Sequence, residues 1–153
     1  MTFLPPIFEL DYWGVYDRGV PNKERIIFKP LVRLNLTSFM VVTGVQTSEN
    51  GVNTLQPFYD NAFWFPDVAI DPPTWVFIFT GPGTPTVSFE KYTGAPLHIL
   101  YWGRKTTIFT TPNIVPVIIR NDGMLFPPST ARQLTEADLT SPQLHLTSPL
   151  KPL

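Results

Sequence analysis

Short apolar runs with a period of two residues dominate the chain, and they predict strands. Between residues 31 and 36, Val32, Leu34 and Leu36 would share one face of an extended segment, with the residues between them on the other. Successive side chains of a strand point to opposite sides, so this alternation is typical of a half-buried strand. We predict strands within the following stretches: 12–16, 25–45, 74–80, 87–90, 97–102, 106–109 and 114–120.

Proline, glycine and asparagine separate these segments. Pro30 has no N–H group to donate to a ladder, so it marks an edge or a break, after which residues 39–42 would continue the sheet. Asn50-Gly51 is the sharpest short-range signal for a β-hairpin. We expect an aromatic loop over residues 58–67, and we expect turns at 81–85 and 121–123.

The stretch 74–80 is apolar on both faces. Trp75, Phe77 and Phe79 would point one way, and Val76 and Ile78 the other. A strand with two apolar faces is covered on both sides. We therefore expect a second sheet, an arm or a partner chain on each side of it.

Many short strands separated by turn residues favour an all-β fold, either a β-sandwich or a jelly-roll-like barrel. The only helical candidate spans residues 130–138, where Thr130 and Gln133 have the spacing of a capping box. We divide the chain into an N-terminal extended arm (1–10), a β-sandwich domain (11–126) and a short helix with a Pro-rich C-terminal arm (127–153).

Composition excludes several classes of function. The net charge is −1 and only 15% of residues are charged, so binding of nucleic acid through net positive charge is not expected. Cysteine is absent, which removes disulfides, thiolate metal sites and cysteine nucleophiles. No apolar stretch approaches the ~20 residues of a membrane-spanning helix, and prolines interrupt the apolar N-terminus, so we expect neither a membrane span nor a secretory signal.

Histidines and acids offer little catalytic chemistry. His98 lies within a predicted strand and His145 in the C-terminal arm, so a hydrogen-bonded structural histidine is the favoured interpretation. Asp60, Asp67 and Asp71 surround the aromatic loop and could contribute to a calcium site, but turn formation explains them as well. We expect no cofactor and no metal.

Two further motifs have simple structural interpretations. Gly81-Pro82-Gly83 precedes a strand rather than a helix, so it is a tight turn and not a phosphate loop. Arg104 and Lys105 follow Trp102 and fit a solvated hairpin tip better than a stacking site. A small hydrolase has the least support, because no nucleophile, base and orienting group can be named together.

The feature that exceeds the needs of one small domain is apolar surface. Aromatic residues make up 14% of the chain, and both ends are apolar and rich in proline. Interface cores are depleted in charge and enriched in aromatic residues, so we favour assembly over a self-contained sandwich whose arms pack on its own surface. The residues expected to bind copies of the chain or other structural proteins are Phe3, Leu4, Ile7, Phe8, Leu144, Leu146 and Leu150.

A small cysteine-free β domain with apolar arms at both ends resembles the auxiliary structural proteins of tailed-phage virions, such as capsid cement or decoration proteins and neck or tail components. Residues 61–65, 75–83, 101–104 and 113–116 are also similar to small uncharacterised microbial β proteins, a likeness that carries no activity. The first resemblance implies a non-enzymatic structural role and a virion location, reached by assembly in the host cytoplasm. Outside a virion we expect a cytoplasmic protein.

The alternative is a ligand-binding β module with an aromatic platform for carbohydrate. An exposed ring beside polar groups can stack on a sugar face. The candidate platform residues are Tyr59, Trp64 and Trp102.

Overall fold

The chain folds mainly into strands, which confirms the predicted all-β class. A computed structural model describes residues 6–125 and 132–139, apart from the side chains of residues 58–60. Two units are distinguished, residues 1–122 and 123–153, and all the strands belong to the first. Within the described part of the chain, no helix is long and apolar enough to cross a membrane.

The larger sheet has five strands in the order β1-β2-β7-β9-β8. Its strands are β1 (Leu10–Tyr16), β2 (Arg25–Pro30), β7 (Trp75–Phe79), β9 (Pro96–Tyr101) and β8 (Thr86–Phe89). Neighbouring strands are antiparallel except for β7 and β9, which run parallel. β1 and β8 are therefore the edge strands of this sheet.

The second sheet has three antiparallel strands in the order β10-β4-β5. They are β4 (Phe39–Glu49), β5 (Val52–Trp64) and β10 (Ile114–Arg120). Asn50 and Gly51, with φ of 52° and 76°, form the two-residue turn that joins β4 to β5, as their sequence predicts. A short pair, β3 (Leu34–Asn35) with β6 (Ala69–Ile70), completes the strands.

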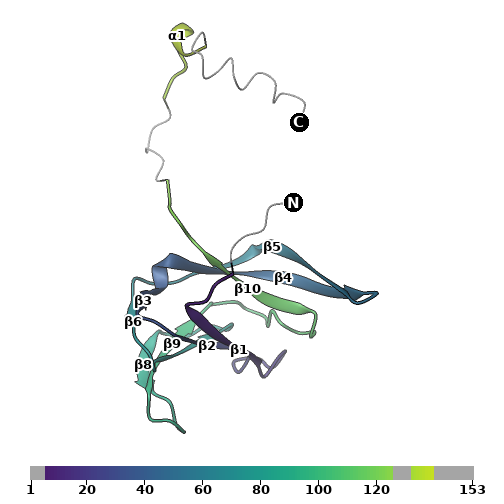
Figure 1. Ribbon diagram of the computed structural model, residues 1–153, viewed down its shortest axis with the longest axis vertical. Helices are drawn as coiled ribbons and strands as arrows, with labels where there is room; N and C mark the ends of the chain where they lie inside the picture. The colour runs from purple at the N-terminus through teal and green to yellow at the C-terminus, as the bar shows by residue number, and fades with distance from the viewer. Residues whose placement is uncertain (1–5, 126–131, 140–153) are drawn as a thin grey trace. The chain divides into compact units, whose positions relative to one another are not determined.

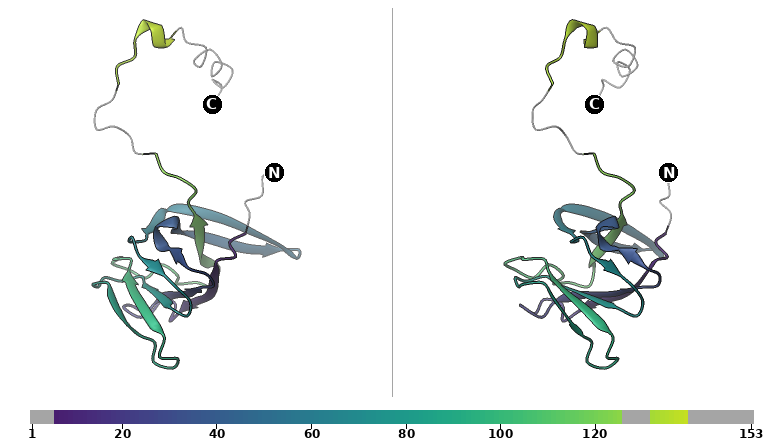
Figure 2. Two further views of the ribbon diagram at one scale, coloured as in Figure 1. Left: turned by 60° about the vertical axis from the view of Figure 1, so that its left-hand side comes forward. Right: turned by 90° about the vertical axis from the view of Figure 1, so that its left-hand side faces the viewer.

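The hydrophobic core lies between these two sheets, which form separate layers in Figures 1 and 2. Ile26 and Phe28 of β2 and Val76 and Ile78 of β7 are buried together with Val41 of β4. The fold is thus sandwich-like. The parallel β7–β9 pair distinguishes its connectivity from an all-antiparallel jelly roll.

The strand at β7 has the predicted alternation. Val76 and Ile78 are fully buried in the core, whereas Trp75, Phe77 and Phe79 are half-buried on the outer face of the sheet. Val76 and Ile78 pair with residues of β2 and of β9, so the strand is central. An unbroken apolar run here does mark a central strand.

The prediction of a strand over residues 31–36 is wrong. β2 ends at Pro30, only Leu34–Asn35 is extended, and a 3-10 helix η1 (Leu36–Ser38) follows. The side chain of Asn35 accepts a hydrogen bond from the backbone N–H of Thr37 and so caps this turn. The next strand, β4, lies in the other sheet, so residues 39–42 do not continue the first one.

Four other local predictions are also wrong. Residues 58–64 belong to strand β5 rather than to a loop: Phe58, Phe63 and Trp64 pair with β4, and the register shifts between Phe58 and Phe63. Residues 106–109 form no strand, and the backbone N–H groups of Ile108 and Phe109 donate to the carboxylate of Glu24. Residues 121–123 form no turn, and the helix is confined to α1 (Glu136–Leu139), with residues 132–135 outside it. The capping residue Thr130 lies outside the described residues.

Candidate functional site

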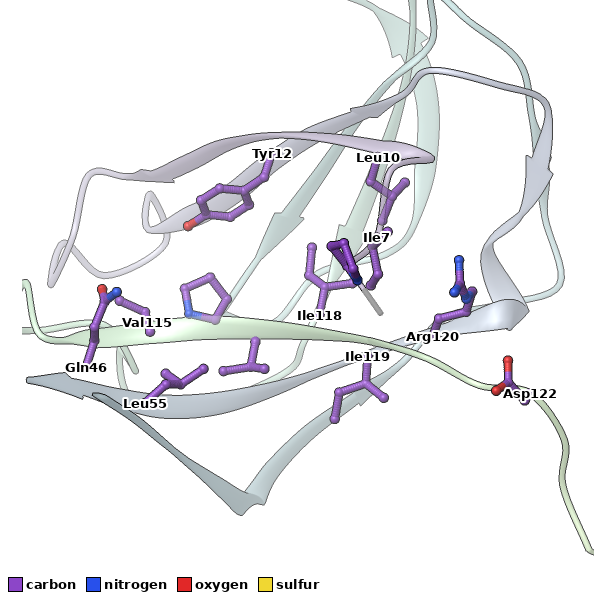
Figure 3. Close-up of a pocket in the computed structure, with 13 residues that line it drawn as sticks. Ile7, Leu10, Tyr12, Gln46, Leu55, Val115, Ile118, Ile119, Arg120 and Asp122 are labelled. Atoms are coloured by element: carbon purple, nitrogen blue, oxygen red, sulfur yellow. The ribbon is translucent and has the colours of Figure 1, made fainter. Parts of the chain in front are cut away.

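An apolar groove of about 570 Å³ lies where the edges of the two sheets meet. Its walls come from β1 and the segment before it, from β10, and from the β4–β5 hairpin, as Figure 3 shows. Leu10 and Tyr12 stand on one side, and Leu55 on the other side of β10. Gln46 and Asp122 are among the polar groups of the lining.

Strand β10 presents its edge to this groove. Residues 115–120 all line it, although successive side chains of a strand point to opposite faces. A cavity that contacts six consecutive residues of a strand therefore runs along its edge and not over one face alone. Among the strands that the structure describes, β10 is paired only with β4 and β1 only with β2, so each of them has one edge that no described strand covers.

The hydrogen-bond pairing of β10 with β4 shows which backbone groups of β10 lie on its free edge. The N–H of Gln46 donates a hydrogen bond to the carbonyl oxygen of Asn113, and the N–H of Asn121 donates one to the carbonyl oxygen of Ser38. The backbone N–H and C=O groups of the odd-numbered residues of β10 therefore point toward β4. The backbone N–H and C=O groups of the even-numbered residues 114, 116, 118 and 120 point toward the free edge. Pro116 has no N–H to offer there, a common protection of edge strands.

Arg18 occupies the start of this free edge. Its Nη1 donates to the carbonyl oxygens of Thr111 at 3.1 Å and Ile114 at 2.7 Å. The backbone N–H and C=O groups of Ile118, with those of Arg120, are the next along the edge. No backbone partner for either residue's edge groups occurs within the described part of the chain.

The N-terminal segment borders the groove. Ile7 packs against the domain's own core, whereas Phe8 is 76% exposed. Glu9 forms an ion pair with Arg120 at the end of β10. The pKa of Glu9 is lowered by a hydrogen bond from its own backbone N–H and by the charge of Arg120. Partial burial raises the pKa of Tyr12, so its phenol stays neutral.

A second pocket, of about 320 Å³, brings together two of the three predicted platform residues. Trp64, 57% exposed at the end of β5, and half-buried Trp102 both line it. Trp102 packs on Phe63, with ring centroids 5.6 Å apart, and on Phe109 at 6.3 Å. The third predicted residue, Tyr59, has a side chain outside the described set.

The other sequence candidates fill structural positions. The amide of Asn35 donates to Asp67 at 2.7 Å, and Asp71 pairs with Arg33 at 3.1 Å. Asp60 lies among the side chains that are not described, and the described residues hold no group of three His, Cys, Asp or Glu able to bind a metal.

The structure also places His98 and Arg104. His98 is half-buried on β9, and desolvation lowers its pKa. Arg104 is not at a hairpin tip: its backbone N–H bonds the carbonyl of Thr80. Of the predicted partner-binding residues, Phe3, Leu4, Leu144, Leu146 and Leu150 lie outside the described residues, as does His145.

The outer face of the five-stranded sheet carries an aromatic cluster that sequence reasoning missed. Arg25 lies 5.7 Å from the ring centroids of Tyr16, Phe77 and Phe79 and pairs with Asp17 at 2.6 Å. Cross-strand register brings the ring of β1 and the two rings of β7 around Arg25, which lies on β2 between them. The odd-numbered aromatics of β7 were visible in the sequence, but their neighbours on β1 and β2 depend on strand order.

Comparison of this chain with protein-family models, with curated proteins and with solved structures gave no match. The case for a function therefore depends on the geometry of the groove and the aromatic pocket.

Proposed function

We propose that the protein is a non-enzymatic structural component that joins copies of itself, or other structural chains, through the apolar groove between the sheet edges. The observation that supports this best is the coincidence of free backbone edge and apolar lining along β10. Free edges recruit added strands, and apolar walls supply the favourable free energy when a partner covers them.

Exposed apolar side chains elsewhere support the same proposal. Val87 and Phe89 on the edge strand β8 are 68% and 72% exposed, and Tyr92 in the following turn is 89% exposed. Apolar groups gathered near a sheet edge favour protein contacts. The assembly that we propose is a phage virion, following the resemblance to cement, decoration, neck and tail proteins.

Two residues on β5 give a matched test of the groove. Leu55 lines it and is 49% exposed, whereas Val52, 61% exposed on the same strand, does not. Sedimentation velocity over a range of concentrations should show that the full chain self-associates. Leu55→Asp should reduce the associated fraction and Val52→Asp should leave it unchanged. A monomer at all concentrations would count against self-assembly, and equal effects of the two changes would exclude the groove as the contact.

The virion assignment needs the native source. Density-gradient sedimentation followed by mass spectrometry should place the chain with a large particle at fixed stoichiometry. Recovery only as a small free species would overturn a virion role.

The second candidate is carbohydrate binding at the pocket of Trp64 and Trp102. It is favoured by one observation: two tryptophans 38 positions apart in sequence line the same opening. A glycan titration should shift tryptophan fluorescence in the native chain and not in Trp64→Ala. Trp13→Ala, which removes a 50% exposed tryptophan absent from that lining, is the control. The absence of any shift across a glycan panel would count against this candidate.

A further inference from the structure

The C-terminal sequence has the pattern of an added strand. Between residues 143 and 147, Leu144 and Leu146 fall on even positions and the polar Gln143, His145 and Thr147 on odd ones. Ser148 and Pro149 interrupt this alternation before Leu150. In an extended conformation residues 143–147 would place the two leucines on one face and the polar side chains on the other. This segment lies outside the described residues, so the pattern comes from the sequence alone.

We propose that the groove receives residues 142–151 of a second copy of the chain, laid along the free edge of β10. The inference rests on the proposed function and names the partner of that groove. The backbone N–H and C=O groups of Ile118 and Arg120 would bond the added segment, and its leucines would cover the apolar lining.

The edge of β10 limits where such a segment can pair. Arg18 already bonds the carbonyl of Ile114, and Pro116 offers only a carbonyl. Pairing is therefore confined to the half of the strand that runs from Pro116 to Arg120. Residues 142–151 contain two prolines, Pro142 and Pro149, which lack N–H donors, so a short ladder suits this segment.

The sequence between β10 and the segment favours a second copy over the chain's own tail. Residues 121–141 separate the two, and they include Pro127-Pro128. The residue before each proline is biased toward extended backbone, which disfavours a close reversal there. A tail that reaches a neighbour gives each copy one donor and one acceptor, and so allows assembly to continue.

The absence of cysteine makes a direct test possible in the full chain. Two full-length variants, Leu146→Cys and Tyr12→Cys, are mixed and oxidised, with a mass tag on one of them. Tyr12 and Trp13 of β1 are 46% and 50% exposed, and only Tyr12 lines the groove. A mixed disulfide dimer should therefore form in about tenfold higher yield than from Leu146→Cys with Trp13→Cys. Equal yields would overturn the proposal. So would an intrachain disulfide in the double variant Tyr12→Cys/Leu146→Cys, which would place the chain's own tail in the groove.

A second measurement separates this inference from the proposed function. Leu144→Asp/Leu146→Asp should weaken self-association by about tenfold or more, because two apolar contacts are lost. Gln143→Asp/His145→Asp adds the same charge on the polar positions and should change association much less. If the native chain assembles and the leucine variant assembles equally well, the tail inference fails while the proposed function stands. If the native chain is a monomer, both fail.

Discussion

The carboxylate of Glu24 accepts a hydrogen bond from the backbone N–H of Phe109, at 3.1 Å and across 85 positions of sequence. It also accepts from the N–H groups of Ile108 and Gly19, both at 2.7 Å, and from the hydroxyl of Thr80 at 2.9 Å. Glu24 is 1% exposed and has no cation partner among the described residues. Four donors thus satisfy a buried carboxylate and fix residues 106–109 against the sandwich.

Glu24→Gln should destabilise the fold by about 2 to 4 kcal/mol, because the amide nitrogen would face backbone N–H groups that need an acceptor. Urea unfolding followed by tryptophan fluorescence measures the change. Glu49→Gln at the exposed end of β4 is the control and should cost less than about 0.5 kcal/mol. Equal losses for the two variants would contradict a special role for Glu24.

Gly83→Ala should also destabilise the protein. A Cβ at this position would stand 2.3 Å from the Cε1 of Tyr101, closer than any real contact. The ring of Tyr101 stacks on that of Phe79, with centroids 5.5 Å apart. The clash forces either Tyr101 to rotate away from Phe79 or the backbone to shift, and either change should lower the free energy of unfolding by about 1 to 3 kcal/mol. In a double-mutant cycle with Tyr101→Ala the two losses should be strongly non-additive. Additive losses would show that the clash is not with that ring.

Stability should fall as the pH is lowered through the titration of His98. Its pKa in the folded chain lies below the ordinary 6.5, because burial disfavours the charged ring. Between the folded pKa and 6.5 the unfolded chain binds more protons, so the free energy of unfolding decreases as pH drops. The free energy of unfolding should differ less between about pH 7.5 and about pH 5.5 in His98→Gln than in the native chain. An unchanged difference would exclude His98 as the cause.

Arg25→Met should lower the free energy of unfolding by about 1 to 2 kcal/mol. The methionine side chain keeps most of the apolar packing, but the contacts of the guanidinium with three rings and its ion pair with Asp17 are lost. Arg33→Met is the matched control. Its ion pair with Asp71 is exposed, with Arg33 73% accessible, so its loss should stay within about 0.5 kcal/mol. Thermal unfolding of both variants provides the comparison, and similar shifts would argue against a cation–aromatic contribution.

Local patterns predicted much of the strand content. The Asn50-Gly51 hairpin, the apolar strand β7 and the strands β1, β8, β9 and β10 were all predictable because each depends on residues that are neighbours in sequence. The strand predicted at 31–36 failed because Asn35 favours a capped turn over an extended chain. Residues 106–109 have the composition of a strand, but the backbone N–H groups of Ile108 and Phe109 donate to the distant Glu24 instead of to a neighbouring strand.

The candidate sites also divide into features set by neighbours in sequence and features set by residues far apart along the chain. The sequence by itself determined that this is an all-β chain without cysteine chemistry and that both of its ends are apolar and rich in proline, because composition and period are local properties. Only the tertiary structure decided that Trp64 and Trp102 share a pocket and that the edges of β1 and β10 border one groove. Both depend on strand order and sheet packing, which bring together residues far apart along the chain.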